Sequence, residues 1–169
     1  MLVVSDTTPI ITLLKINRLE ILQILFGKVL IPRAVFKELT KNEFYKNESE
    51  TVKNSDFINV NEVENLQAVK ILREVVGLDA GESESIALAE EINSDILLMD
   101  ERKGRQVAKK LNLKIVGTVG ILLHAYDENI LSESDILECI EILKNSNIRI
   151  SQNLLDLIVK HIEGGQKFR

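Results

Sequence analysis

The apolar positions of this 169-residue chain form short continuous runs that alternate with longer stretches of helical spacing. Short apolar runs are typical of buried strands. They occur at residues 2–5, 29–31, 57–60, 96–99 and 114–116. Between these runs, apolar residues recur every three or four positions, as they do on one face of a helix. The alternation predicts an α/β fold with a mostly parallel sheet and helices packed on both of its faces.

Helical spacing and stop signals define the expected helices. Two short helices are expected before Gly27, with a break near Asn17, and Pro32 suits the first turn of the next helix. Further helices are predicted over residues 64–76, 82–92, 102–111, 118–126, 133–144 and 151–163. Segment 41–54 is polar and charged, which indicates a frayed helix end and a loop. No strand pattern follows residue 118, so the last helices are expected to extend beyond the alternating part of the chain.

Composition limits the class of protein. The length fits one domain with a single core, and with 4% aromatic residues and no Trp that core must be built from Leu, Ile and Val. The lone Cys139 lies in an apolar helical pattern, so no intramolecular disulfide can form and a reducing cytoplasm is the simpler location. No apolar run approaches the ~18 residues that span a bilayer, and the N-terminus lacks a signal-peptide pattern. A cytoplasmic protein is therefore expected.

The charge distribution is more informative than the total. A net charge of −5 argues against a protein that simply coats nucleic acid, because such proteins present a large basic face. Residues 102–114, called the basic segment below, nevertheless carry six Lys and Arg residues and no Asp or Glu. This segment is a candidate surface for phosphate groups. The alternative is an ordinary solvated helix face.

Two aspartates directly follow predicted buried strands. Asp6 closes the run at 2–5, and Asp100 closes the run at 96–99. In a parallel sheet the carboxyl ends of the strands meet at one edge, so the two side chains are expected on the same side of the molecule. An Asp at such a position is well placed to hold a cation. Capping of the following helix is the alternative role for either residue.

Two glutamates lie on helices that are predicted to pack on the sheet. On a helical wheel, Glu82 lies near the centre of the apolar side of its helix, and an inward carboxylate needs a cation or a hydrogen-bonding partner. The alternative is a capping box over residues 79–82, in which Glu82 bonds back to the turn. Glu38 lies at the flank of its apolar face, where solvated glutamates are common. Oxygen ligands without Cys or nearby His favour Mg²⁺ or Mn²⁺ over Zn²⁺.

Several segments carry a resemblance to a known family. They are Val-Val-Ser-Asp-Thr-Thr-Pro-Ile-Ile at 3–11, Ile-Pro-Arg-Ala-Val-Phe-Lys-Glu-Leu at 31–39, Leu-Asp-Ala-Gly-Glu-Ser-Glu-Ser-Ile-Ala-Leu-Ala at 78–89 and Leu-Leu-Met-Asp-Glu-Arg at 97–102. Together with Gly-Thr-Val-Gly at 117–120, they resemble the ordered motifs of a PIN domain over about residues 2–130, and most of all the prokaryotic PIN proteins related to VapC toxins.

The resemblance implies a three-layer α/β/α fold with a central parallel sheet of four to five strands, to which the helical pattern after residue 131 adds extra C-terminal helices. Residues 1–130 would form the nuclease domain, and 131–169 a helical extension packed on the same domain. The implied activity is that of a divalent-metal-dependent endoribonuclease that hydrolyses single-stranded RNA, with Mg²⁺ or Mn²⁺ as its cofactor. The resemblance further implies that the chain is the toxin half of a toxin–antitoxin pair, with an antitoxin protein and a second copy of the chain as candidate partners.

Residue by residue, the resemblance assigns the acids of the family to four positions, called the acidic group below. They are Asp6, Glu38, Glu82 and Asp100. Asp6, Glu82 and Asp100 are the expected metal ligands. Thr7 or Thr8 matches the hydroxyl that supports the first Asp, and Glu101 is an alternative to Asp100 for the last acid. The expected nucleic-acid contacts are Arg102, Lys103 and Arg105.

Other functions fit the sequence less well. A haloacid-dehalogenase-type phosphatase needs a second Asp two residues after its nucleophile, where this chain has Thr8. A phosphoacceptor receiver domain needs adjacent acids after its first strand, where this chain has Ser5 and Asp6. The main alternative to an enzyme is a catalytically silent PIN-like protein that binds nucleic acid or a partner. Dependence of cleavage on a divalent metal separates the two interpretations.

Overall fold

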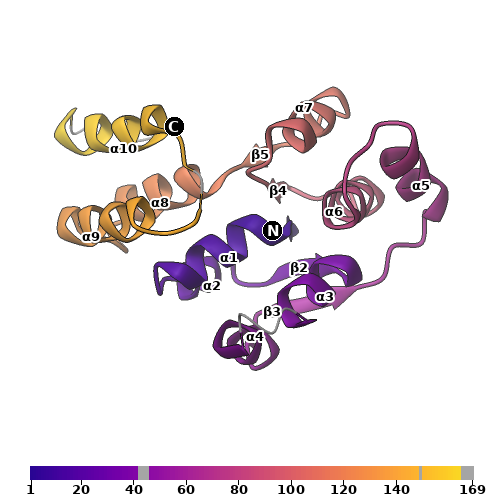
Figure 1. Cartoon of the computed structure of the whole chain (residues 1–169), viewed down its shortest axis with the longest axis horizontal. Helices are drawn as coiled ribbons and strands as arrows, with labels where there is room; N and C mark the ends of the chain where they lie inside the picture. Colours follow the sequence, from indigo (N-terminus) through magenta and orange to yellow (C-terminus); the bar gives the residue numbers. More distant parts are fainter. Residues whose placement is uncertain (42–45, 149, 165–169) are drawn as a thin grey trace.

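The sheet has five strands, all parallel, as expected for an α/β protein. The computed structural model describes residues 1–41, 46–148 and 150–164. The strands are β1 (Val3–Ser5), β2 (Val29–Pro32), β3 (Ile58–Asn61), β4 (Ile96–Leu98) and β5 (Ile115–Val116). Their order in the sheet is β3-β2-β1-β4-β5, and each neighbouring pair is parallel. The first strand of the chain therefore lies at the centre of the sheet (Figure 1).

The helices follow the predicted boundaries closely. They are α1 (Thr7–Lys15), α2 (Glu20–Phe26), α3 (Arg33–Lys41), α5 (Leu66–Glu74), α6 (Ala80–Glu91), α7 (Arg102–Lys110), α8 (Thr118–Asp127), α9 (Glu133–Lys144) and α10 (Gln152–Gly164). Asn17 separates α1 from α2 in the left-handed region, with φ of 57°, a conformation that Asn tolerates better than most residues. Within the described part of the chain, no helix is long and apolar enough to cross a membrane.

One prediction about segment 41–54 is wrong. Helix α4 (Lys46–Lys53) occupies most of the expected loop, while residues 42–45 of that expectation lie outside the described residues. Ser49 and Val52, three positions apart, are 4% and 2% exposed, and the Ser49 hydroxyl donates to the Thr40 carbonyl oxygen at the end of α3. Because Val52 is the only apolar residue of the helix, its periodicity is too weak to be recognised in the sequence.

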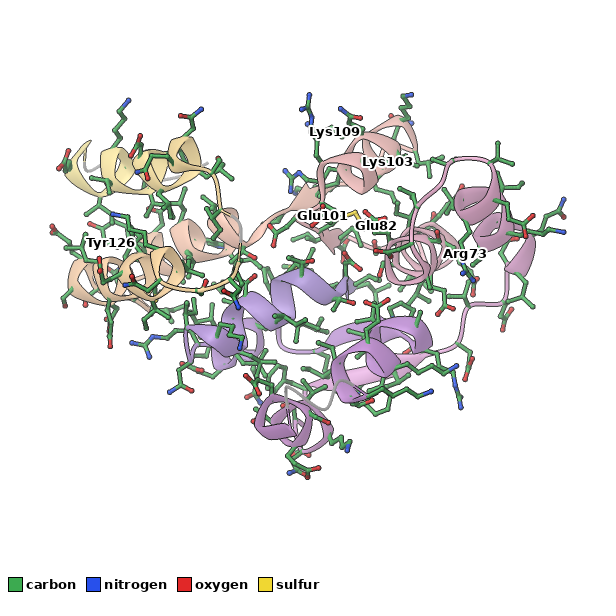
Figure 2. All side chains as sticks on the ribbon, in the orientation of Figure 1. Arg73, Glu82, Glu101, Lys103, Lys109 and Tyr126 are labelled. Atoms are coloured by element: carbon green, nitrogen blue, oxygen red, sulfur yellow. The ribbon has the colours of Figure 1, made fainter. Side chains whose placement is uncertain are left out.

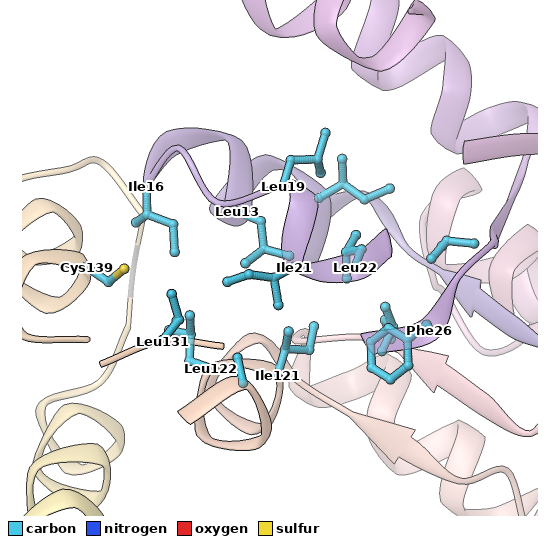
Figure 3. Packing of buried hydrophobic residues seen from close by; sticks show 14 of the residues in the cluster. Leu13, Ile16, Leu19, Ile21, Leu22, Phe26, Ile121, Leu122, Leu131 and Cys139 are labelled. Atoms are coloured by element: carbon cyan, nitrogen blue, oxygen red, sulfur yellow. The ribbon is translucent and has the colours of Figure 1, made fainter. Parts of the chain in front are cut away.

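The side chains of the central strands alternate between two hydrophobic clusters, one on each face of the sheet. Val3 and Leu98 belong to the larger cluster, with residues of α1, α2, α8, α9 and α10. Val4 and Leu97 belong to the smaller one, with residues of α5, α6 and α7. Figure 3 shows part of the larger cluster, which contains leucines, isoleucines and Cys139. Burial on both faces explains why the strands appear in the sequence as continuous apolar runs.

The C-terminal helices continue the larger cluster. Ile136 on α9 and Ile158 on α10 are fully buried and belong to the same cluster as Ile10 on α1. Figure 1 shows α8, α9 and α10 together at one end of the molecule, with α5 at the other. His161 on α10 is 2.8 Å from Asp127 at the end of α8. The division at residue 130 into a nuclease domain and an extension stays a prediction.

Candidate active site

The carboxyl edge of the two central strands brings Asp6 and Asp100 to the same part of the molecule. Asp6 follows β1, and its N–H donates to the Leu98 carbonyl oxygen of β4 over 2.9 Å. Asp100 comes two residues after the end of β4. From β1 the chain proceeds to β2 on one side and later returns to β4 on the other, so this is the point where the strand order reverses. Ligands of open α/β sheets bind in the crevice at such a point.

Asp6 and Glu38 face each other across the backbone of Gly81. A Cβ atom at residue 81 would lie 3.0 Å from Glu38 Oε1 and 3.3 Å from Asp6 Oδ1. The first turn of α6 therefore lies directly against both carboxylates. The Thr7 hydroxyl donates to Glu38 Oε2 over 2.6 Å. The hydroxyl that the resemblance linked to the first Asp is thus bonded to the second acid, while the Thr8 carbonyl oxygen accepts from Thr12 within α1.

Asp6 is a buried acid surrounded by other acids. The residue is 3% exposed, and its side chain makes no capping hydrogen bond to α1. Burial raises the pKa of Asp6 to about 7, the Thr7 backbone N–H lowers it, and the negative charges of Asp79, Glu38 and Glu82 raise it further. Burial also raises the pKa of Glu38, against the hydrogen bond from Thr7. Both carboxylates therefore gain stability from a proton or a cation placed between them.

Glu82 points inward, as its position on the helical wheel predicted, and it also forms the capping box. It is 7% exposed; its Oε2 accepts from the Asp79 N–H over 3.0 Å, and its own N–H donates to Asp79 Oδ1 over 2.8 Å. Burial raises the pKa of Glu82, the hydrogen bond from the Asp79 N–H lowers it, and the charges of Asp79 and Glu101 raise it. The capping interpretation is confirmed, whereas a metal-binding role for Glu82 stays a prediction.

Asp100 is held by the start of α8. Its Oδ1 accepts from the Thr118 N–H over 2.8 Å, and its Oδ2 accepts from the Thr118 hydroxyl over 2.6 Å. A Cβ at Gly117 would lie 2.7 Å from Asp100 Oδ1 and 2.9 Å from an Nη atom of Arg105, so the three residues are in close contact. This role of Thr118 was not predicted from the sequence. The available signal was a hydroxyl at the first turn of the helix that follows the neighbouring strand β5.

Glu101, the alternative last acid, forms no hydrogen bond that would fix its side chain at the start of α7. It precedes α7 as its N-cap and is exposed. Figure 2 shows it beside Glu82, which agrees with the effect of its charge on the pKa of Glu82. Asp100 is thus anchored between β4 and α8, whereas Glu101 faces solvent near Glu82. Whether Asp100 or Glu101 acts as the fourth acid of the site stays a prediction.

The first turn of α7 places three basic residues next to these acids. Arg102 is exposed. The Lys103 ammonium group donates to the Gly77 carbonyl oxygen over 2.8 Å, and its charge lowers the pKa of Glu82. Arg105 is half-buried and donates to the Met99 carbonyl oxygen over 2.6 Å. Lys103 and Arg105 therefore each use one donor within the protein, and the roles of all three in binding phosphate stay predictions.

The donor set suits a hard divalent cation. Within residues 1–41, 46–148 and 150–164, no three Asp, Glu, His or Cys side chains already converge closely enough to enclose an ion. Asp6 and Glu38 nevertheless both lie against Gly81, and their pKa values are raised by burial and by like charge. Carboxylate oxygens are the ligands that Mg²⁺ and Mn²⁺ prefer, and an ion there would offset the repulsion. The residues present fit such an ion.

Comparison with known proteins identifies the family. A family model described as a PIN domain matches residues 2–164, which includes the C-terminal helices. No curated protein matches the chain significantly. PIN domains are typically nucleases and usually use divalent metals, in agreement with acids at the strand-order reversal of a parallel sheet. With a match over nearly its whole length and the five-stranded parallel sheet expected of the fold, the chain belongs to the PIN domain family.

Proposed function

We propose that this protein is a divalent-metal-dependent endoribonuclease that hydrolyses single-stranded RNA. The observation that carries the proposal is the buried Asp6 carboxylate, which faces Glu38 at the reversal point of the sheet and has its pKa raised to about 7 by burial and by neighbouring acids. A buried acid among acids destabilises the metal-free protein. A bound cation would offset this destabilisation by neutralising the buried negative charge.

Asp6 and Glu38 would hold the cation, with Glu82 and Asp100 as flanking acids. A bound Mg²⁺ or Mn²⁺ supplies Lewis-acid chemistry, since it polarises a phosphodiester and favours deprotonation of water. The Thr7 hydroxyl fixes the Glu38 carboxylate, and Thr118 fixes that of Asp100, so neither has to be ordered during the reaction. Attack of water on phosphorus with cleavage of the P–O3′ bond leaves a 3′-hydroxyl and a 5′-phosphate.

The basic segment supports a nucleic-acid substrate. An acidic site repels a polyanion, and cationic side chains next to it offset that repulsion and attract the phosphate backbone. Arg102 and Arg105 stand in the first turns of α7, which begins two residues after Asp100. Arg105 uses one guanidinium N–H on the Met99 carbonyl oxygen, and its planar fork has further donors for a phosphate.

We further propose that the chain is the toxin half of a toxin–antitoxin pair of the VapC-like branch, that it acts in the cytoplasm, and that it forms a homodimer. The order of the motifs between residues 3 and 102 supports this proposal, because that order resembles prokaryotic PIN proteins of this branch. Growth arrest of cells that express the wild-type chain, but not the Asp6→Asn variant, tests the toxin role. Analytical ultracentrifugation of the purified protein tests the dimer.

Cleavage of labelled RNA tests the activity itself. The purified protein is incubated with a single-stranded RNA, and with the same sequence as DNA, in Mn²⁺, Mg²⁺ or EDTA. We expect RNA cleavage in either metal, none in EDTA and none by Asp6→Asn. Glu90→Gln is the matched control, because Glu90 is an exposed acid of α6, the helix that carries Glu82. Equal cleavage with and without EDTA, or by Asp6→Asn, would contradict the proposal.

One observation favours the alternative of a catalytically silent, partner-binding or nucleic-acid-binding protein. Three members of the acidic group already accept hydrogen bonds from the protein: Glu38 from Thr7, Glu82 from Asp79 and Asp100 from Thr118. Such bonds could stabilise acids that have no catalytic role. Under this alternative the protein binds single-stranded RNA in a filter-binding assay, cleaves it in neither metal, and binds no Mn²⁺ at Asp6.

A further inference from the structure

Glu84 of α6 supplies a hydrogen-bond acceptor to the start of another helix. Its Oε2 accepts from the Ala34 N–H, in the first turn of α3, over 2.8 Å. The first N–H groups of a helix have no acceptor within that helix, and Pro32, directly before α3, has no side-chain oxygen that could serve. The Glu84 side chain, half-buried where α3 and α6 pack, takes that place. Helix α3 is therefore capped from α6 rather than by the residue before it.

The capped turn stands one turn before Glu38. Ala34 and Glu38 are four residues apart on α3, so they lie on one face of the helix. On α6, Gly81 and Glu84 are three residues apart and are neighbours in the same way. Across the interface Glu84 bonds to Ala34, and one turn away Glu38 Oε1 is 3.0 Å from the Cβ position of residue 81. The hydrogen bond thus fixes the register in which α3 passes α6, and with it the place of the Glu38 carboxylate.

The Glu38 carboxylate is sensitive to that register because it has a second contact on another helix. The Thr7 hydroxyl of α1 donates to Glu38 Oε2 over 2.6 Å. A slide of α3 by one residue moves its side chains by about 1.5 Å along the helix axis. A misplacement of about 1 Å in an active site can reduce the rate about 100-fold. The contact that sets the register of α3 is therefore a candidate for control of the site.

The cap alone does not identify a role at the site, because α6 caps a second helix in the same way. Glu91, seven residues after Glu84 and thus on the same face of α6, accepts from the N–H groups of residues 64 and 65 at the start of α5, over 3.0 and 3.1 Å. Helices α3 and α5 both pack against α6 (Figure 1). Only α3 carries a member of the acidic group, Glu38. The two glutamates have the same bonding role and differ in what the capped helix carries.

We propose that Glu84 is a positioning residue of the candidate active site: through its hydrogen bond to Ala34, it holds Glu38 against Gly81, where Glu38 binds the cation together with Asp6. The inference rests on the proposed metal-dependent cleavage and adds to it a residue outside the acidic group. Glu84 acts through α3 and touches neither the ion nor the RNA. Replacing residues that orient metal ligands typically changes metal affinity or activity by about 10- to 100-fold.

Replacements that keep or remove the acceptor test this inference. Glu84→Gln retains a side-chain oxygen for the Ala34 N–H, whereas Glu84→Leu removes it at similar side-chain volume. Glu91→Leu is the matched control, because it removes the same kind of cap from α5. The kcat and KM of RNA cleavage, the Mn²⁺ dissociation constant and the thermal midpoint are measured for each variant. The nuclear Overhauser contact between the Gly81 Hα protons and the Glu38 side chain is measured on metal-free protein.

We expect Glu84→Leu to lower kcat and Mn²⁺ affinity about tenfold each and to lose the Overhauser contact, while the KM for RNA changes little. Glu84→Gln should keep all of these properties. Glu91→Leu should lower the thermal midpoint, as Glu84→Leu does, and yet keep kcat, Mn²⁺ affinity and the Overhauser contact. A role in stability alone cannot separate the two leucine variants in this way.

Wild-type kcat and Mn²⁺ affinity in Glu84→Leu would overturn the inference and leave the proposed function intact. Equal losses in Glu91→Leu would attribute the effect to stability, and equal losses in Glu84→Gln would attribute it to charge, so either result would overturn it as well. A wild type that neither binds Mn²⁺ nor cleaves RNA would overturn the proposed function. In that case the Overhauser contact alone decides whether Glu84 positions Glu38.

Discussion

Two buried aspartates lie in opposite electrostatic surroundings. Asp127, at the end of α8, has a side chain that is 6% exposed and lies 2.8 Å from His161 of α10. Asp6, at the sheet edge, is equally inaccessible but faces Glu38, Glu82 and Asp79. A buried acid with a hydrogen-bonding partner contributes to stability, whereas a buried acid among acids opposes it. The difference agrees with the proposed function, in which Asp6 binds a cation while Asp127 stabilises the fold.

Replacing each aspartate by asparagine should give opposite results. Asp6→Asn should reduce metal-dependent cleavage by about 100- to 1000-fold, the usual effect of removing a charge-stabilising group from an active site, without loss of thermal stability. Asp127→Asn should lower the free energy of unfolding by about 1–3 kcal/mol, because it disturbs a buried pair, and leave cleavage per folded molecule unchanged. Urea denaturation and RNA cleavage measure the two effects. If Asp6→Asn lowered the free energy of unfolding as Asp127→Asn does, the two aspartates would not differ in their contribution to stability.

The pH dependence of stability should show the same contrast. Burial raises the pKa of Asp6 from its ordinary value of 3.8 to about 7 in the folded protein. Between these values the folded state binds more protons than the unfolded state, so stability falls as pH rises through this window, by up to about 1.4 kcal/mol per pH unit for one proton. Glu38 and Glu82, whose pKa values are also raised, act in the same direction.

The metal-free protein should therefore melt at a lower temperature at pH 8 than at pH 5. Asp6→Asn should show a smaller decrease, and Mn²⁺ should restore the midpoint of the wild type at pH 8. Asp127→Asn serves as the comparison, since it should keep the decrease of the wild type. Calorimetric scans at several pH values measure these midpoints. A midpoint that rises steadily from pH 5 to pH 8 would contradict the raised pKa of the buried Asp6 carboxyl.

A smaller effect is expected at Gly81, whose backbone lies against both Asp6 and Glu38. Gly81→Ala places a methyl group against both carboxylates, at 3.0 and 3.3 Å, and should displace them by a few tenths of an ångström. We expect cleavage to fall about threefold to tenfold, less than the ~100-fold effect of a 1 Å misplacement. Gly164→Ala on α10 is the control, because nothing lies within 4 Å of its Cβ position. Equal activity of the two variants would indicate that the carboxylates adapt freely.

The smallest effect is expected at Thr118. Thr118→Val removes the hydroxyl that donates to Asp100 Oδ2 and keeps the backbone N–H that donates to Oδ1. One hydrogen bond is worth about 1 kcal/mol, so the rate of cleavage should fall about fivefold. Thr118→Ser retains the hydroxyl and should recover most of the rate. Identical rates for the valine and serine variants would show that the orientation of Asp100 does not limit the reaction.

Much of the fold could be predicted because the chemistry that decides it is local. The strands are buried on both faces and appear as continuous apolar runs, and the breaks at Asn17 and Gly77 coincide with positive φ values of 57° and 76°. The capping box of Asp79 and Glu82 is also a local pattern. Helix α4 was missed because its burial depends on one apolar side chain and on packing against α3.

The contacts of the candidate site could be predicted only in part. The general rule for parallel sheets placed Asp6 and Asp100 at the same edge, whereas the direct pairing of β1 with β4 comes from the structure. The partnership of Asp100 with Thr118, eighteen residues later, depends on β5 lying next to β4, which no spacing reveals. Likewise, the contact of Gly81 with Asp6 and Glu38 depends on how α3 and α6 pack. The reason for a glycine at this position could therefore not be recognised from the sequence.

The central position of β1 also affects the synthesis of the protein. Asp6 leaves the ribosome well before β4 is synthesised, yet its backbone N–H bonds to Leu98, and Asp100 is fixed by Thr118. At about 5–20 residues per second, roughly 5 to 20 s separate the synthesis of Asp6 from that of β4. During that interval the nascent chain has no complete acidic edge. On the proposed function, in which this edge is the catalytic site, the nascent protein stays inactive until β4 and the start of α8 have been translated.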